Sequence, residues 1–233
     1  MSKRMDSLEN KLMPVAYKFA NNRYLLAIRD GFMLTMPLLI IGSIFMLLAY
    51  LPITGYDAFM ARVFGENWMD FFSVAYNTTM SIMTIFVIIG ISGSLSDYYK
   101  LERLNTAVIS LVAFFILTPF VTSFTGIIPT EWIGAKGLFV GMLTAILSTE
   151  IVKWVTKKGW VIKMPAGVPP TVGKAFSSLI PAAITIIIFD IIRLIFAFTP
   201  FETIHNFIYS ILQVPLTSLG DTLGAALIAN FFV

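Results

Sequence analysis

The chain has 233 residues, of which 58% are hydrophobic and only 12% are charged, and its formal net charge is +3. Because soluble domains usually carry roughly a quarter charged residues, this composition excludes an ordinary soluble domain and predicts an all-α, polytopic membrane protein. Since there is no cysteine and only one histidine, His205, we exclude disulfides, thiolate chemistry and a clustered histidine metal site, and expect no metal or cofactor.

Residues 1–30 are too polar to contain the apolar core of a cleavable signal, so the first apolar run is expected to be an uncleaved membrane anchor. Within them, Ser7–Leu26 brings apolar residues near one face of a helix, with the charges elsewhere. Such an amphipathic helix suits either the inner leaflet of a membrane or a position beneath the helix bundle, and both alternatives stay open. The apolar positions are Leu8, Leu12, Val15, Phe19 and Leu26.

The apolar runs that follow are long enough to be membrane spans, since a transmembrane helix needs about 20 mostly apolar residues. The sequence predicts five complete spans and the start of a sixth, which begins near Leu219 and runs to Val233. The complete spans are predicted at Phe32–Pro52, Phe71–Ser92, Thr106–Phe124, Leu138–Val155 and Leu179–Pro200.

Basic residues in the flanks of these spans indicate their orientation, because cytoplasmic loops carry an excess of lysine and arginine. If the five spans alternate, thirteen of the sixteen basic residues fall on one side, which predicts a cytoplasmic N-terminus. The excess of basic residues therefore reflects membrane topology, and we expect no nucleic-acid partner. The thirteen are Lys3, Arg4, Lys11, Lys18, Arg23, Arg29, Lys100, Arg103, Lys153, Lys157, Lys158, Lys163 and Lys174.

The connection between the fourth and fifth predicted spans is basic and rich in proline. Pro165, Pro169 and Pro170 lack amide donors and bias the residues before them toward extended geometry. Backbone of this kind requires water or protein partners, so we expect a loop at the inner face whose lysines can meet anionic headgroups.

Asp190 and Arg193 are ionisable residues within the fifth predicted span. They are three residues apart on a helix, so their side chains share a face and can form an ion pair. Ionisable groups at membrane depth are costly and usually face protein or a water-filled cavity. Two roles stay open: a structural pair that fixes how this span packs, or a part in transport.

Two further titratable residues lie near span ends. Glu150 is expected to reach Lys153 or water in a structural role. The stretch FETIHNFIYSIL predicts an amphipathic helix on the outer face, within residues 201–233, and His205 in it is expected to be a solvated polar group. No paired catalytic groups occur at one depth, so a catalytic site is not expected.

Glycine spacing and the end of the chain carry two more expectations. Gly137 with Gly141, and Gly220 with Gly224, have the spacing that lets helices approach closely in lipid. The final stretch LGAALIANFFV is apolar and has no polar flank, which predicts that these residues are the front part of a longer polypeptide.

Three stretches together resemble one protein family: LLAIRDGFMLTMPLLIIGSIFMLL, DYYKLERLNTAVISLVAFFILTP and MPAGVPPTVGKAFSSLIPA. Over essentially its whole length the chain resembles the membrane-spanning IIC subunit of lactose/cellobiose/diacetylchitobiose permeases of the bacterial sugar phosphotransferase system. The combination of the arginine-aspartate-glycine entry, the later Met-Pro and the Val-Pro-Pro loop carries the resemblance.

The resemblance implies a homodimeric transport subunit, not an enzyme, in the bacterial inner membrane. It implies import of a β-linked disaccharide such as cellobiose, diacetylchitobiose or lactose, with IIB and IIA phosphocarrier subunits supplying the phosphoryl group. Residues 31–200 would form a scaffold and dimer-contact domain. The sugar-binding motifs of the family would follow beyond Val233, so no substrate-binding residue is expected within 1–233. A self-contained membrane scaffold or assembly protein without a transported solute is the alternative.

Overall fold

The computed structural model describes residues 13, 17, 21–119, 130–165 and 167–220, and its regular elements over these residues are all helical. This confirms the all-α prediction for the described part of the chain. The elements are α2 (Arg23–Ala49), α3 (Tyr56–Phe64), α4 (Trp68–Asn77), α5 (Met83–Tyr99), α6 (Arg103–Leu117), α7 (Thr130–Ile133), the short 3₁₀ helix η1 (Ala135–Gly137), α8 (Leu138–Lys157), α9 (Pro170–Ser177), α10 (Leu179–Ala197) and α11 (Ile204–Gly220).

Helix α2 begins at Arg23, well before the predicted start of the first span at Phe32. Its start is capped by Asn22, whose side-chain oxygen accepts a hydrogen bond from the Tyr24 amide at 2.9 Å. The buried residues of α2 have small side chains, whereas its large apolar residues are mostly exposed. Helix α2 therefore packs closely against its neighbours through a face of small residues. The buried positions are Ala27, Gly31, Thr35, Gly42 and Ala49.

The predicted second span, Phe71–Ser92, is wrong as a single helix: α4 ends at Asn77, a turn follows, and α5 starts at Met83. Thr78 Oγ1 and Thr79 Oγ1 donate to carbonyls four residues earlier, at 2.8 Å each. Local side-chain bonds of this kind compete with the helical backbone. The helix is therefore interrupted at this short stretch of polar side chains within the predicted span.

Helix α5 forms the centre of the bundle and packs against α2, α6 and α8. Val87, Ile88 and Ile91 are fully buried within the hydrophobic core. At the crossing of α2 and α5, a Cβ atom added to Gly90 would lie 2.6 Å from the Cα of Gly31. The two backbones therefore meet directly, and only glycine fits at this crossing.

The other predicted spans correspond to helices with similar bounds. Helix α8 covers the predicted Leu138–Val155, α10 covers most of Leu179–Pro200, and α6 covers Thr106–Phe124 as far as Leu117. Within the described residues, three helical stretches are long and apolar enough to cross a membrane: Arg23–Ala49, Ala135–Lys157 and Pro170–Ala197. α5 and α6 are shorter apolar helices, so the number of spans stays a prediction.

Two predicted segments lie wholly or mostly outside the described residues. Most of the amphipathic segment Ser7–Leu26 falls there, although its last residues belong to α2. The sixth span is described only as far as Gly220, the last residue of α11. Helix α11 itself coincides with the predicted amphipathic helix after the fifth span.

The predicted loop before the fifth span is only partly a loop. Residues up to Pro169 are non-helical where described, but α9 then begins at Pro170. Proline suits the first position of a helix because its fixed φ is already helical and its missing N–H would have no partner there. The prediction placed Pro170 in the inner-face loop, whereas in the structure it is the first residue of α9.

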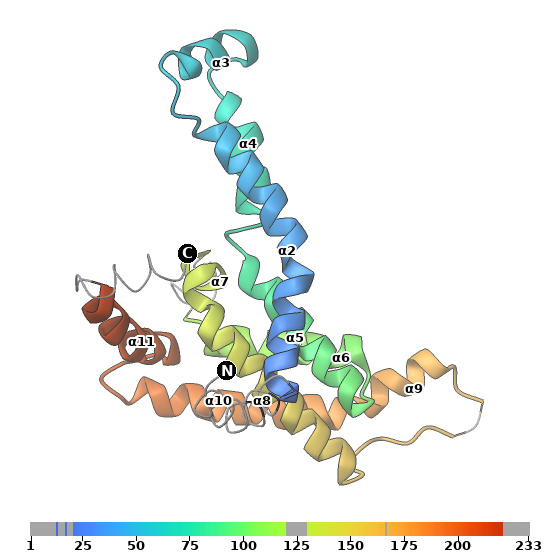
Figure 1. Ribbon diagram of the computed structural model, residues 1–233. Helices are drawn as coiled ribbons and strands as arrows, with labels where there is room; N and C mark the ends of the chain where they lie inside the picture. The colour runs from blue at the N-terminus through green and yellow to red at the C-terminus, as the bar shows by residue number, and fades with distance from the viewer. Residues whose placement is uncertain (1–12, 14–16, 18–20, 120–129, 166, 221–233) are drawn as a thin grey trace, which may run out of the picture.

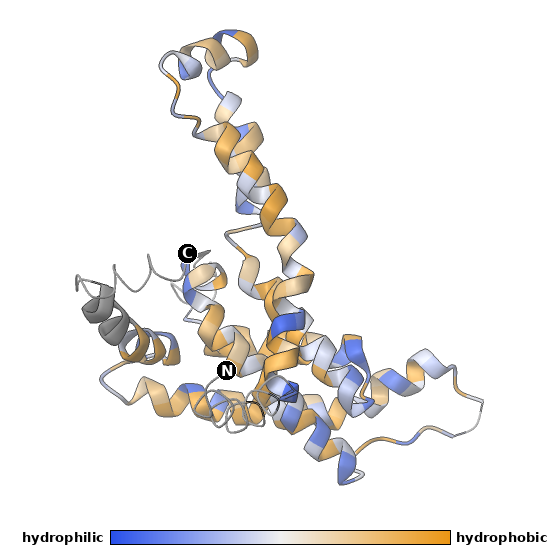
Figure 2. Ribbon diagram, in the orientation of Figure 1, coloured by the Kyte–Doolittle hydropathy of each residue, from blue (hydrophilic) through white to orange (hydrophobic). Residues whose placement is uncertain are grey.

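The helices form a body and a projecting arm. In Figure 1, α2 and α4 run together away from the other helices and carry α3 at the far end, while α10 lies across the base of the body. Figure 2 shows hydrophobic residues along most of α2 and α10, with hydrophilic residues gathered near the ends of α6 and α8. We call the part of α2 that pairs with α4, together with α3 and α4, the arm.

Candidate functional site

The ion pair predicted within the fifth span is present in the geometry of α10. Arg193 Nε lies 2.9 Å from Asp190 Oδ1, and both side chains are 48% exposed. The buried residues of α10 are Pro181, Thr185 and Phe189, which pack inward. The pair is thus held at the surface of the body rather than enclosed in its core.

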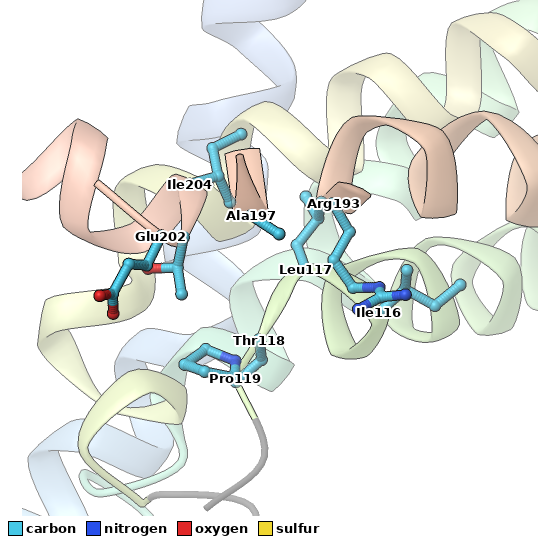
Figure 3. Close-up of a pocket in the computed structure, with 9 residues that line it drawn as sticks. Ile116, Leu117, Thr118, Pro119, Arg193, Ala197, Glu202 and Ile204 are labelled. Atoms are coloured by element: carbon cyan, nitrogen blue, oxygen red, sulfur yellow. The ribbon is translucent and has the colours of Figure 1, made fainter. Parts of the chain in front are cut away.

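Arg193 also lines a cavity of about 320 Å³ where α6, α10 and the α10–α11 connection meet. Figure 3 shows the Arg193 side chain reaching toward Ile116 of α6, whereas the Glu202 carboxylate points away from Arg193. The cavity therefore carries a guanidinium group beside apolar side chains. Its lining residues are Ile116, Leu117, Thr118, Pro119, Arg193, Ala197, Glu202, Thr203 and Ile204.

His205 lies next to this cavity and is only 1% exposed, so its predicted solvated position is wrong. Its Nε2 lies 3.2 Å from Thr118 Oγ1, and its ring lies 4.8 Å from that of Trp132 and 5.6 Å from that of Phe114, centroid to centroid. Because three segments of the chain close over the imidazole, sequence periodicity within α11 alone could not predict its burial.

The hydrogen bonds around His205 indicate its tautomer, that is, which ring nitrogen carries the proton. Thr118 Oγ1 donates to the Phe114 carbonyl at 2.9 Å, so Nε2–H is the group left to donate to Thr118. His205 Nδ1 is buried and has no hydrogen-bond partner among the residues that the structure describes. Helix α11 follows the span candidate Pro170–Ala197, and burial there lowers the pKa of His205 to about 4.

A second cluster joins α2, α5 and α8 around Glu150. Its Oε2 accepts a hydrogen bond from Lys153 Nζ at 2.7 Å, as the sequence predicted. Its Oε1 accepts from the Tyr24 hydroxyl at 3.0 Å and also from the Tyr99 hydroxyl. Arg23 stacks on the ring of Tyr24, 4.8 Å from its centroid.

The tyrosines and Arg23 were not predicted as partners of Glu150. They come from segments far away in the sequence, and each is unremarkable within its own helix. The available signal in the sequence was the position of the two tyrosines: Tyr24 lies just before the first apolar run and Tyr99 just after the second. In the structure this cluster ties the first residues of α2 to the last residues of α5.

The Arg-Asp-Gly stretch at the start of the first predicted span gains a physical explanation. Asp30 Oδ2 accepts a hydrogen bond from Ser94 Oγ of α5 at 2.7 Å, and Arg29 Nη2 lies 2.7 Å from Asp30 Oδ1. Gly31 follows at the contact with Gly90. The acidic residue and the glycine therefore fix the same helix crossing, one by a hydrogen bond and the other by its small size.

The other two stretches that carry the family resemblance contact each other. Asn105 Nδ2 of α6 donates to Ser178 Oγ at 2.8 Å, and Glu102 Oε1 lies 3.0 Å from Lys174 Nζ of α9. These contacts anchor α9 against the turn between α5 and α6. The resemblance therefore rests on segments that the fold brings together.

The predicted glycine contacts are described for one pair. A Cβ atom on Gly137 would lie 1.7 Å from the Trp132 carbonyl oxygen, and one on Gly141 would lie 2.5 Å from Thr84 Cγ2. Both glycines therefore stand at close approaches, Gly141 between α8 and α5. Gly220 ends α11 at a position whose side-chain surroundings are not described, and Gly224 lies outside the described residues.

Two of these clusters attach helices to each other: Asp30 accepts a hydrogen bond from Ser94 of α5, and Glu150 accepts from Tyr24 of α2 and Tyr99 of α5. The Asp190–Arg193 pair stays within α10. Among the described residues, no three His, Asp or Glu side chains gather in a way that could hold a metal ion. The arrangement suits a rigid support.

Comparison with known proteins gives consistent matches over the whole chain. The family model described as phosphotransferase system, EIIC matches residues 29–233. The chain is 43% identical to the cellobiose-specific EIIC component of Geobacillus stearothermophilus, over 100% of this chain and 54% of that protein. It is 42% identical to the lichenan permease IIC component of Bacillus subtilis (strain 168), over 99% of this chain and 53% of that protein.

A further relative and a solved structure extend these matches. The oligo-beta-mannoside-specific EIIC component of Bacillus subtilis (strain 168) is 42% identical, over 98% of this chain and 52% of that protein. The crystal structure of the transporter ChbC, the IIC component from the N,N'-diacetylchitobiose-specific phosphotransferase system, matches with a TM-score of 0.86 and 45% identity, over 95% of this chain and 54% of that one. The chain spans about half the length of the curated relatives that it matches.

Proposed function

This chain belongs to the phosphotransferase system EIIC family, and on that basis we propose that it is the scaffold part of a membrane permease for a β-linked disaccharide. In this role the chain is a transport subunit. IIB and IIA partners carry the phosphoryl group, and IIB transfers it to the sugar.

The observation that carries this proposal is the ChbC match, at 45% identity over 95% of the chain. The sugar for which ChbC is named, N,N'-diacetylchitobiose, is a β-linked disaccharide. The names of the relatives point to the same linkage, since cellobiose, lichenan and oligo-β-mannosides are all joined by β-bonds. We therefore propose a cellobiose-like, diacetylchitobiose-like or lactose-like disaccharide.

The contacts between helices support the separation of a scaffold domain from a sugar-contacting part. The Glu150 cluster, the Asp30–Ser94 hydrogen bond and the Gly31–Gly90 crossing hold helices together. We assign residues 31–200 to a scaffold and dimer-contact domain. The sugar-contacting groups are proposed to lie in the part of the relatives that this chain does not match.

The membrane arrangement belongs to the same proposal. We assign the N-terminus to the cytoplasmic side of the bacterial inner membrane, with five spans and the start of a sixth. The broken helix pair α4–α5 serves as the second span. The homodimer contact is assigned to the arm, because large apolar side chains such as Ile40, Ile44 and Phe71 are exposed there.

Asp190 and Arg193 are proposed to hold the scaffold against the sugar-binding part, since their ion pair is exposed beside the cavity at the end of α10. Both residues lie on α10, so their ion pair joins no two helices of the described chain. The double variant Asp190→Ala/Arg193→Ala is therefore expected to keep its thermal stability but to lower sugar phosphorylation by the completed permease. If the double variant phosphorylated sugar as well as the original protein, the ion pair would not hold the scaffold against the sugar-binding part.

The function is tested by joining this chain to the part of the Geobacillus stearothermophilus cellobiose relative that follows the matched region. Cells that express the joined protein with IIA and IIB, and that lack their own permease, are supplied with labelled cellobiose or labelled maltose. We expect accumulation of phosphorylated cellobiose and little phosphorylated maltose, because maltose is α-linked. Membrane insertion without phosphorylation of either sugar would favour the self-contained scaffold protein instead.

A further inference from the structure

The end of α8 displays two tryptophans in a fixed geometry. The rings of Trp154 and Trp160 meet edge to face, with centroids 5.3 Å apart at 77°. Their side chains are 47% and 49% exposed, so each ring has one covered part and one open part. They differ in this from Trp68, which is 4% exposed.

The helix end itself produces this pair. Gly159 adopts the left-handed conformation, with φ of 77°. The Trp160 amide donates to the Val155 carbonyl at 3.2 Å, and the Gly159 amide donates to the Thr156 carbonyl at 3.0 Å. These two bonds define a Schellman cap, which turns the chain back onto the last turn of the helix. Trp160 is therefore held against Trp154 by backbone geometry.

Two lysines lie beside the tryptophans. Lys157 and Lys158 follow Trp154 by three and four residues, which places them on the same face at the end of α8. Both are exposed, and within the described part of the chain neither forms an ion pair or a cation–π contact. Lys153 and Lys174, in contrast, each contact a glutamate.

We propose that these four residues, the tryptophan–lysine cap (Trp154, Lys157, Lys158 and Trp160), bind the headgroup of an anionic phospholipid. Helix α8 belongs to a stretch long and apolar enough to span a membrane, so its end lies where hydrocarbon gives way to headgroups. Indole rings favour that depth, and lysines there attract negatively charged lipids.

The fixed geometry of the cap favours lipid over a soluble acidic partner. A Schellman cap holds the indoles in place before binding, so little side-chain freedom is lost when a headgroup settles against them. Half-exposed indoles beside free ammonium groups match a ligand with an apolar tail and an anionic head. The inference rests on α8 and not on the sugar that the protein carries.

The test uses the full chain in vesicles that contain phosphatidylcholine or phosphatidylglycerol brominated near the headgroup end of the acyl chain. Bromine quenches tryptophan on contact. Of the four tryptophans, Trp154 and Trp160 are exposed, whereas Trp68 is buried and Trp132 is half-buried. We expect stronger quenching by the brominated phosphatidylglycerol at equal mole fraction. The preference should weaken as salt is added, because salt screens exposed charges.

The decisive variant is Lys157→Gln/Lys158→Gln. A lysine near an anionic surface contributes about fivefold to binding, so the double variant should lose about 25-fold in its preference for phosphatidylglycerol. The matched control, Arg62→Gln/Lys136→Gln, removes one exposed charge of α3 and one of η1, which precedes the opposite end of α8, and should keep the preference. Thermal melting of both variants checks that they remain folded.

Three results would overturn the proposal. Equal quenching of the unaltered chain by the two lipids would show no headgroup preference and would favour a soluble acidic partner. A preference retained by Lys157→Gln/Lys158→Gln would place the lipid elsewhere, as would an equal loss in the control. None of these outcomes bears on cellobiose phosphorylation, so the two proposals fail independently.

Discussion

At the scale of single residues, His205 packs between two aromatic rings, and no charged group of the described residues lies within hydrogen-bonding distance of it. The titratable or charged groups of the elements around it are Arg103, Glu131, Lys136, Asp190, Arg193, Glu202 and Tyr209. A proton added to its ring would be poorly solvated there, because the surroundings are apolar apart from Thr118. Its neutral form is therefore part of the folded state.

We predict that acid weakens the fold through this residue. The pKa of His205 is lowered from 6.5 to about 4 by burial, so the unfolded chain binds a proton at a higher pH than the folded chain does. Stability is then fully present above pH 6.5 and falls as the pH drops toward 4, by on the order of 3 kcal/mol. Thermal melting in detergent across this range measures the loss.

His205→Gln is the matched control, because glutamine can still donate to Thr118 but does not titrate in this range. Carboxylates elsewhere contribute equally to both proteins, so the difference between their melting curves isolates His205. If the melting temperatures of the two proteins fell in parallel from pH 7 to 4, His205 would not be the source of the loss of stability.

Glu150 offers a second prediction, since two tyrosine hydroxyls and Lys153 all depend on its carboxylate. Glu150→Ala leaves these groups without an acceptor, which typically costs about 1–3 kcal/mol. Glu150→Gln retains one acceptor oxygen and should cost less. Melting temperatures of the two variants should therefore rank alanine below glutamine, and an alanine variant as stable as the original would contradict the described cluster.

At the scale of the elements, the crossing of α2 and α5 depends on two glycines whose backbones touch. Gly90→Ala would place a methyl group 2.6 Å from the Gly31 Cα atom, and neither backbone can move without displacing its helix. Overpacking of this kind typically costs about 1–3 kcal/mol. We expect a clear fall in melting temperature.

Gly173→Ala in α9 is the control for this prediction. No heavy atom lies within 4 Å of its added Cβ, and alanine favours a helix more than glycine does. This variant should be neutral or slightly more stable. Similar losses for the two substitutions would argue against a direct contact between Gly31 and Gly90.

The same elements show how far the sequence alone could predict the structure. Helix α8 was predicted to within a few residues, because a continuous apolar run between glycine and lysine has clear ends. The α4–α5 break was missed because the run was interpreted as one continuous span across the short polar stretch at residues 77–81. Spacing within one helix predicted the Glu150–Lys153 and Asp190–Arg193 contacts.

Contacts between distant segments lay beyond such reasoning. Tyr24 is separated from Glu150 by 126 residues, and His205 from Thr118 by 87. Local patterns hold no information on which helix faces which. The family resemblance indicated the kind of protein but not these partners.

At the scale of the whole molecule, the arm distinguishes this protein from a closed helical bundle (Figure 1). In the arm, α2 pairs with α4 and its large apolar side chains, such as Ile40 and Ile44, are exposed. Such a surface requires lipid or a second chain around it. We predict that the arm contacts the arm of a second copy. The absence of cysteine makes this directly measurable, because one introduced cysteine is then the only thiol.

In membranes under mild oxidation, Ile40→Cys on the arm should form a disulfide-linked dimer of twice 25.9 kDa. Ile187→Cys on α10 is the control, since Ile187 is 58% exposed and Ile40 is 56% exposed. Both thiols are equally accessible, so only proximity to a second copy should separate them. Equal cross-linking at the two positions would contradict a dimer contact on the arm.

We propose that this chain supports a sugar site without containing it. The most direct measurement is equilibrium binding of labelled cellobiose to two purified proteins: the chain alone, and the chain joined to the remaining part of the cellobiose relative. We predict saturable binding to the joined protein and none to the chain alone. Saturable binding to the chain alone would place a sugar site within residues 1–233 and contradict the account.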